Sequence, residues 1–98
     1  MTRLDPRNSR EWDVQESKYT GEWTRTSGEG EDVQHFKHYA GDEMKVHYAG
    51  DHVYVERYKP GDLHYYHGTV SEDGRTVDGK YLIANWDGEK TWSAQLHY

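Results

Sequence analysis

The sequence predicts an all-β protein, an antiparallel up-and-down meander of about seven strands forming a small barrel, with a short N-terminal helix or arm. Tight turns separate stretches of alternating apolar and polar residues through most of the chain. No segment has the helix length that a parallel crossover needs, so sequential strands pair. We expect one domain over residues 1–98, with the helix or arm in residues 1–18.

The N-terminal residues are polar, and Asn8 followed by Glu11 fits a capping box. A helix of about two turns is therefore expected over residues 11–18, anchored by Trp12. The alternative is an irregular arm with a buried Trp12. In both cases the segment is expected to lie at one end of the sheet.

The following strands are expected over residues 19–25, 33–39, 44–48 and 52–59. Burial decides the register of residues 52–59. A two-residue turn at Pro60-Gly61 would put Tyr54 on the apolar face. One extra residue in that turn moves every side chain of the strand to the opposite face. We choose the longer turn, which buries Val53, Val55 and Arg57 opposite Met44, Val46 and Tyr48. With a three-residue turn over residues 40–42, Phe36 and His38 also point inward.

The last three strands, over residues 63–98, are joined by two turns with hairpin chemistry. Ser71-Glu72-Asp73-Gly74 suits a type I turn with its loop over residues 72–74, and Asp87-Gly88 suits a two-residue type I′ turn. These turns bring one apolar face into register across the three strands. Val77 then faces Thr69, Gly79 faces His67, Tyr81 faces Tyr65 and Ile83 faces Leu63. On the other side Ile83 faces Trp92, Tyr81 faces Ala94, Gly79 faces Leu96 and Val77 faces Tyr98.

Residues 18–24, Lys-Tyr-Thr-Gly-Glu-Trp-Thr, resemble the Lys-Tyr-x-Gly-x-Trp strand that opens the lipocalins, and the Thr-Gly-x-Trp-Thr run is similar to the first strand of avidins. Residues 66–81 resemble small bacterial β-barrel domains of calycin type. The resemblance implies a calycin-like barrel that binds small molecules in a cup, with Gly21 letting the strand bend and Trp23 packing across the closed end. The later lipocalin motifs and the biotin contacts of avidins have no counterpart here, so no particular ligand is implied.

The composition limits the classes of function. Aromatic residues make up 14% of the chain, with nine Tyr and four Trp, so the core must be built from large rings with polar handles. There is no cysteine, which excludes disulfides and thiolate zinc sites and favours a cytoplasmic location. The first residues contain no apolar run for a signal peptide or membrane span. A net charge of −6, with acids and bases interleaved, argues against a nucleic-acid partner.

The usual catalytic and metal motifs are not present. None of the seven histidines lies two residues from another, so no strand offers two ligands on one face, and we expect no metal and no cofactor. A site built across strands from His38 and His67 is the alternative. There is no G-x-S-x-G elbow, no carboxylate pair on the inner face, and no helix after Gly28-x-Gly30 to cradle a phosphate.

We therefore expect a small-molecule-binding barrel with an aromatic-lined cup for a flat or conjugated ligand that carries a carboxylate or ketone. Arg57 and His67 are expected to hold the polar group, because no inward carboxylate is evident as a partner for Arg57 and Gly79 leaves room opposite His67. The remaining ligand-binding residues are expected to be His38, Tyr65, Tyr81, Trp92, Trp23 and Phe36. The alternative is that the rings fill a narrow barrel and that Arg57 reaches water at its strand end.

Two other functions fit the same residues. The cup of a cyclase or isomerase would use His67 or Tyr65 as its proton-transfer group. An acidic protein–protein interaction or inhibitor module would use an outward face of His47, Tyr54, Tyr66 and His64. A homodimer is expected if the first and last strands, over residues 19–25 and 90–98, remain open edges.

Overall fold

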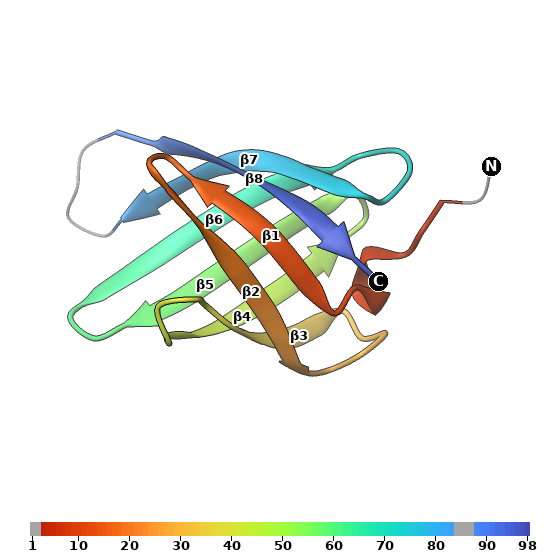
Figure 1. Cartoon of the computed structure of the whole chain (residues 1–98), viewed down its shortest axis with the longest axis horizontal. Helices are drawn as coiled ribbons and strands as arrows, with labels where there is room; N and C mark the ends of the chain where they lie inside the picture. Colours follow the sequence, from red (N-terminus) through yellow and green to blue (C-terminus); the bar gives the residue numbers. More distant parts are fainter. Residues whose placement is uncertain (1–2, 84–87) are drawn as a thin grey trace.

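The computed structural model describes residues 3–83 and 88–98, which form a closed antiparallel barrel of eight strands (Figure 1). The all-β up-and-down meander is confirmed, with one strand more than expected. Among the described residues no helix is long and apolar enough to cross a membrane. The elements are the 3-10 helix η1 (Pro6–Asn8) and the strands β1 (Glu11–Glu16), β2 (Tyr19–Ser27), β3 (Val33–Lys37), β4 (Glu43–Ala49), β5 (His52–Lys59), β6 (Asp62–Val70), β7 (Thr76–Ile83) and β8 (Lys90–His97).

The additional strand is β1, and the helix predicted over residues 11–18 is wrong. Trp12, Val14 and Glu16 are buried, and they alternate with the exposed Asp13 and Gln15 in the two-residue period of a strand. The charged side chain of Glu16 interrupts the apolar alternation, so the sequence pattern does not reveal a strand here. The segment is also not an irregular arm, because it pairs along its whole length with β2 on one side and β8 on the other.

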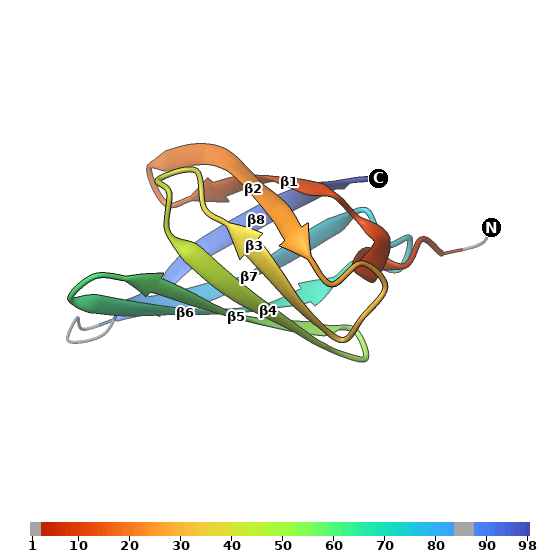
Figure 2. The same ribbon diagram turned by 90° about the horizontal axis from the view of Figure 1, so that it is seen from below.

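The pairing of β1 with β8 closes the wall of the barrel, which Figure 2 shows from below. Of the two alternatives for the terminal strands, closure on each other or open edges, the structure has closure, and among the described strands each has two partners. Closure of this kind removes the unpaired backbone groups through which a second copy could extend the sheet. A homodimer stays a prediction, and it requires another surface.

Three tryptophans fill the middle of the barrel. The ring centroids of Trp12 and Trp23 lie 5.8 Å apart, those of Trp23 and Trp92 lie 5.3 Å apart, and all three rings are nearly parallel. Tyr66 meets Trp23 edge-on, with centroids 5.0 Å apart and an angle of 81° between the rings. Burying rings of this size supplies most of the apolar area available to a small core. The expected open cup is thus filled through its middle, as an eight-stranded barrel of this width permits.

The faces predicted for β3, β4 and β5 are confirmed. Val46 pairs with Val55 and Tyr48 pairs with Val53, and all four side chains are buried. Arg57 points inward opposite Met44, and Phe36 and His38 are buried as expected. The β3–β4 turn lies over residues 39–41, one residue earlier than expected, where the Gly41 N–H donates to the His38 carbonyl. The shift changes the pairing by an even number of residues, so the faces are unaffected.

The face predicted for β6 is wrong, because the loop before β7 is one residue longer than expected. Ser71 and Thr76 are joined by a hydrogen bond from the Ser71 N–H to the Thr76 carbonyl (2.9 Å), which leaves residues 72–75 in the loop. Val70 therefore pairs with Val77. The inward residues of β6 become His64, Tyr66, Gly68 and Val70, in place of Leu63, Tyr65, His67 and Thr69.

The turn at Pro60-Gly61 has two residues, since Lys59 pairs directly with Asp62. The extra residue that the sequence argument assigns to this turn belongs instead to the loop over residues 72–75. The predicted turn at Pro60-Gly61 is one residue too long, and the predicted loop before β7 is one residue too short. Each error reverses the face of β6 relative to one of its neighbours, so β5 and β7 keep their predicted faces. The inward faces of β5 and β7 are therefore right, although the face of β6 between them is reversed.

The β7–β8 pairing differs from the prediction by four residues. Val77 pairs with Ala94 and Gly79 with Trp92, where Tyr98 and Leu96 are the predicted partners. Because the difference is even, Tyr81, Trp92 and the other inward residues of these strands keep their face. Tyr98 instead lies partly exposed beyond β8, and its hydroxyl donates to the Gly74 carbonyl (2.6 Å). Asp87 of the predicted Asp87-Gly88 turn lies outside the described residues.

Gly79 and Gly68 form a pair in which the two backbones approach closely. A Cβ atom on Gly79 would lie 1.8 Å from the His67 carbonyl oxygen, so the space expected opposite His67 is filled by backbone. The indole of Trp92 crosses this pair, and its Nε1–H donates to the carbonyls of His67 (3.0 Å) and Lys80 (3.2 Å). The two glycines therefore allow the two strands and the Trp92 indole to pack closely, and they do not open a pocket.

We expect Gly79→Val to destabilise the fold strongly, because the new side chain must displace β6 backbone. Chemical denaturation should show a loss of at least about 3 kcal/mol in the free energy of unfolding, or no folded protein. Lys80→Val, at the next and outward-facing position of β7, should change that energy by less than about 1 kcal/mol. Equal stability of the two variants would show that Gly79 faces open space.

Candidate functional site

Charged and polar side chains gather inside one end of the barrel, which we call the polar end: the end with the β1–β2, β3–β4 and β5–β6 turns, on the left in Figure 1. The side chains come from β1, β5, β6 and the segment between β3 and β4, over residues 38–42. Seven residues make up this polar cluster: Glu16, His38, Tyr39, Asp42, Arg57, His64 and Tyr66.

The carboxylate of Glu16 is the centre of the polar cluster, with only 3% of the residue exposed. Its Oε2 lies 2.7 Å from His38 Nε2 and accepts a hydrogen bond from the Tyr39 hydroxyl (2.8 Å). Its Oε1 accepts a hydrogen bond from the Tyr66 hydroxyl. Burial alone would raise the pKa of Glu16, but the hydrogen bonds from His38, Tyr66 and Tyr39 outweigh it and lower that pKa below its ordinary value. Glu16 is therefore an anion held by three donors.

The backbone of the β3–β4 turn sets the tautomer of His38. The Ala40 N–H donates to His38 Nδ1 (3.0 Å), so this nitrogen is an acceptor and carries no proton. The proton of the neutral ring then sits on Nε2, from which it is donated to Glu16. Burial and the nearby Glu16 charge raise the pKa values of Tyr66 and Tyr39, which keeps both hydroxyls protonated as donors.

Arg57 is bound firmly on one side and loosely on the other. Its Nε and Nη2 lie 2.8 Å and 2.7 Å from Asp42 Oδ2. Its Nη1 lies 3.5 Å from His64 Nδ1, 3.5 Å from the Tyr66 hydroxyl and 3.9 Å from Glu16 Oε1. All three contacts are longer than an ordinary N–H···O hydrogen bond of about 2.9 Å. Nη1 is thus a buried donor that makes no short hydrogen bond to any described residue.

The polar cluster carries one net negative charge at neutral pH. Burial, together with the charge of Arg57, lowers the pKa of His64, so its ring is neutral. His38 is neutral because its Nδ1 accepts a hydrogen bond. The carboxylates of Glu16 and Asp42 then outnumber the single guanidinium of Arg57. Asp42 and Glu16 are the carboxylate partners of Arg57 that the sequence argument did not find.

Six of the eight predicted ligand-binding residues point inward, and a role in binding stays a prediction for all of them. Arg57 and His38 belong to the polar cluster, and Tyr81 stacks on Tyr66 with ring centroids 4.8 Å apart. The others form the layer below it, where Trp23 contacts both His38 and Trp92, and Phe36 packs on Trp12.

The inward placement predicted for Tyr65 and His67 is wrong. Tyr65 is 46% exposed on the outer wall, and His67 Nε2 lies 3.0 Å from Glu89 Oε2 on that side. The extra residue in the 72–75 loop turns these two side chains out and brings Tyr66 and His64 in. Neither Tyr65 nor His67 can therefore transfer a proton inside the barrel, and a site joining His38 to His67 is also wrong.

Five residues of the polar cluster are not among the predicted site residues: Glu16, Tyr39, Asp42, His64 and Tyr66. The position of Glu16, two residues after Val14 and four after Trp12, was the signal that could have placed it inside the barrel. Asp42 and Tyr39 belong to a turn, and nothing in the sequence shows that they fold back toward Arg57 and Glu16. His64 and Tyr66 face inward because the loop before β7 has four residues, 72–75, and not the three expected.

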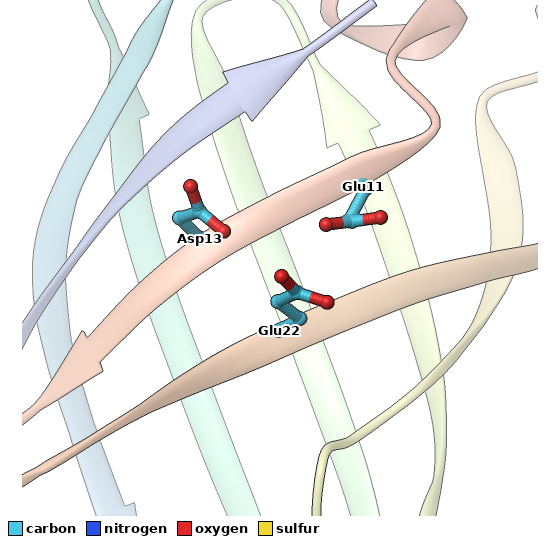
Figure 3. A group of neighbouring side chains, drawn as sticks. All are labelled: Glu11, Asp13 and Glu22. Atoms are coloured by element: carbon cyan, nitrogen blue, oxygen red, sulfur yellow. The ribbon is translucent and has the colours of Figure 1, made fainter.

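A separate acidic group lies on the outer wall, where Glu11 and Asp13 of β1 and Glu22 of β2 point toward one another (Figure 3). Repulsion from Glu11 raises the pKa of Glu22, which is fully exposed. His97 Nε2 lies 2.6 Å from Asp13 Oδ2 at the side of this group. Exposed carboxylates of this kind are common without an ion, and we assign no metal to them.

Comparison of the chain with protein-family models, with curated proteins and with solved structures finds no match.

We expect Glu16→Gln to destabilise the barrel at pH 7, because the amide keeps one acceptor but places an N–H group among three donors and leaves the cluster without its anion. The loss in the free energy of unfolding should be about 2–4 kcal/mol in chemical denaturation. Glu56→Gln is the control, because Glu56 also bonds a histidine, His47 (3.0 Å), but on the outer wall. That change should cost less than about 1 kcal/mol.

The pH dependence follows from the lowered pKa of Glu16. A carboxyl whose pKa is lower in the folded state adds stability above its ordinary value of 4.5, and the contribution is lost as the pH falls toward the lowered value. The difference between wild type and Glu16→Gln should therefore shrink below pH 4.5. A difference that is the same at pH 7 and pH 3, or no larger than that of Glu56→Gln, would contradict the central place of this anion.

Proposed function

We propose that this chain is a small-molecule-binding barrel whose ligand is a flat or conjugated molecule held at the polar end. The observation that carries the proposal is the loose environment of Arg57 Nη1, whose nearest partners all lie at 3.5 Å or more. A buried donor without a short hydrogen bond loses free energy that a suitable acceptor would restore. A carbonyl oxygen of a ligand is such an acceptor.

The shape of the polar end supports this proposal. In both views the β5–β6 hairpin and the end of β7 project beyond the β1–β2 and β3–β4 turns (Figures 1 and 2). Arg57, His64 and Ile83 lie on the inner face of these projecting strands, with Ile83 paired to His64 and packed against the core. The stacked rings of Tyr66 and Tyr81 lie on the same face. Such a surface offers a ring-shaped molecule apolar contact next to one polar donor.

The charge of the polar cluster favours a ketone over a carboxylate. Arg57 already faces Asp42 and Glu16, so a ligand carboxylate would enter a site that is negative before it arrives. Like charges at short range disfavour the charged form of both groups. A neutral carbonyl can accept from Arg57 Nη1 without that repulsion. We therefore narrow the expected ligand to a neutral molecule with a carbonyl group.

Binding fits the site better than catalysis. The proton-transfer groups expected of a cyclase or isomerase, His67 and Tyr65, lie on the outer wall. Glu16 already accepts three hydrogen bonds, which makes it a weak base. The resemblance of residues 18–24 and 66–81 to calycin-type barrels, which bind small molecules, also supports a binding role. The lack of cysteine supports a cytoplasmic location.

The proposal predicts selective binding of acetophenone, a flat neutral ketone, over benzoate, a carboxylate of similar shape. Titration with acetophenone should give saturable changes in the backbone amide chemical shifts around His64 and Tyr81. Benzoate should bind about tenfold more weakly or not at all. Arg57→Met should remove the acetophenone shifts.

Arg25→Met is the matched control, because the Arg25 side chain is 10% exposed, against 9% for Arg57, and it belongs to the opposite end of the barrel, where it bonds the Ser9 carbonyl. Arg25→Met should keep the acetophenone shifts. The proposal fails if neither compound gives saturable shifts, or if Arg57→Met binds acetophenone as wild type does.

A second candidate is self-association through the outer wall of β5, β6 and β7. Tyr54, Tyr58, Tyr65 and Leu82 there are each 40–48% exposed, and Tyr65 lies between Glu56 and Leu82 in the pairing. Of the face predicted for protein contacts, Tyr54 and His47 point outward, whereas Tyr66 and His64 are buried. Exposed aromatic residues are enriched in interfaces, and charges of both signs beside them, Lys45, Glu56 and Lys80, suit a two-fold contact.

Sedimentation at rising protein concentration tests this second candidate. Wild type should shift toward the mass of a dimer, and Tyr65→Ser should shift less, because it removes the ring at the centre of the face. Tyr19→Ser is the control, since Tyr19 is exposed at the start of β2 and lies outside this face. A monomeric mass for wild type at the highest concentration would exclude the dimer.

A further inference from the structure

One member of the polar cluster, Tyr39, sits in a slot shaped like a binding site for its own side chain. The phenol hydroxyl donates to Glu16 Oε2 (2.8 Å). The ring lies against the imidazole of His38, with centroids 3.9 Å apart and 35° between the planes. The ring also occupies the place of a side chain at Gly21, where a Cβ atom would lie 2.1 Å from the Tyr39 ring. The slot therefore has a carboxylate at its base, a flat ring on one side and a bare backbone on another.

Tyr39 is held in this slot more weakly than the other phenol on Glu16. Tyr39 belongs to the β3–β4 turn and is 40% exposed, and its hydroxyl makes a single hydrogen bond. Tyr66 is 2% exposed and is packed between Tyr81 and Trp23. If the Tyr39 ring swings outward, Glu16 still accepts hydrogen bonds from His38 and Tyr66. The turn can thus release Tyr39 without leaving the buried carboxylate unpaired.

We propose that this slot is a phenol-binding subsite, that Tyr39 fills it in the free protein, and that the phenolic ring of a ligand replaces Tyr39. The inference rests on the proposed small-molecule function and names the chemical class of the ligand. The incoming hydroxyl donates to Glu16 Oε2, and the ring takes the place of the Tyr39 ring between His38 and Gly21. A neutral phenol suits a cluster with one net negative charge, whereas an aromatic carboxylate is repelled by Glu16.

Gly21 is the specificity-determining residue of this subsite. A strand in this position does not need glycine for its backbone, because Gly21 has no positive φ and pairs regularly with Val14. What requires glycine is the aromatic ring that lies over it. A methyl group at this position closes the slot to any ring.

The test uses p-cresol, which has the structure of the tyrosine side chain, and toluene, which lacks only the hydroxyl. Tyr39→Gly empties the slot, so it should bind p-cresol at least about tenfold more tightly than wild type, where Tyr39 competes for the same place. Toluene should bind at least about tenfold more weakly than p-cresol, because it cannot donate to Glu16. Adding Gly21→Ala to Tyr39→Gly should abolish p-cresol binding. NMR titration measures each of these affinities.

Tyr39→Phe keeps the ring over Gly21, and it is the variant to titrate with p-cresol if Tyr39→Gly does not fold. Without its hydrogen bond to Glu16 the ring leaves more readily, so p-cresol should bind at least about fivefold more tightly than to wild type. Equal binding of p-cresol and toluene to the emptied slot, undiminished binding after Gly21→Ala, or no gain in affinity with Tyr39→Phe would each overturn the subsite. If acetophenone still binds through Arg57 in that case, only the phenol slot is wrong. If both compounds fail, the small-molecule function is wrong as well.

Discussion

The buried carboxylate of Glu16 is the interaction on which the polar end of this barrel depends. It joins β1 to β6 through Tyr66 and to the β3–β4 turn through His38 and Tyr39, so that segments far apart in the chain meet at two oxygen atoms. A buried charge is costly unless its hydrogen bonds are complete, and here three donors surround it. The Ala40 N–H fixes the tautomer in which His38 donates to this anion, and the anion helps to keep both phenols protonated. Without Glu16 the remaining polar groups would have no common acceptor.

The two ends of the barrel differ because of this anion. At the opposite end the N-terminal segment folds over the opening. Its ion pairs, Arg3–Asp51, Arg7–Asp5 and Arg7–Asp32, are partly exposed, whereas several hydrogen bonds beneath it join neutral groups. Trp12 Nε1–H donates to Ser9 Oγ (2.7 Å), Ser9 Oγ–H donates to the Pro6 carbonyl (2.7 Å), and the Tyr48 hydroxyl donates to Gln34 Oε1 (2.9 Å). The stacked tryptophans separate this end from the polar cluster. The ligand that we propose would therefore meet its polar partners at this end, where Arg57 and Tyr39 are the least firmly held groups.

The parts of the fold that were predictable are those where apolar alternation alone decides. Met44, Val46 and Tyr48 opposite Val53 and Val55 left one sensible register for β4 and β5. In β6 the sequence His-Tyr-Tyr-His is almost symmetric about its centre, so burial favours neither face, and the face depends on whether the next loop has three residues or four. Turn chemistry does not determine that count. The strand β1 was missed because Glu16 is the inward residue that should have completed its pattern. The apparent lack of a partner for Arg57 followed from that omission and from the fold of the segment that carries Asp42, which the sequence does not show.

Direct titration of Glu16 tests this account most simply. With carboxyl-¹³C-labelled glutamate, NMR follows the protonation of this single side chain as the pH falls. Three hydrogen bonds to the carboxylate predict a midpoint below the ordinary value of 4.5, with the resonances of His38 and Tyr66 changing in the same transition. A midpoint at or above 4.5 would mean that burial outweighs the donors and that Glu16 is not the anion that organises the polar end.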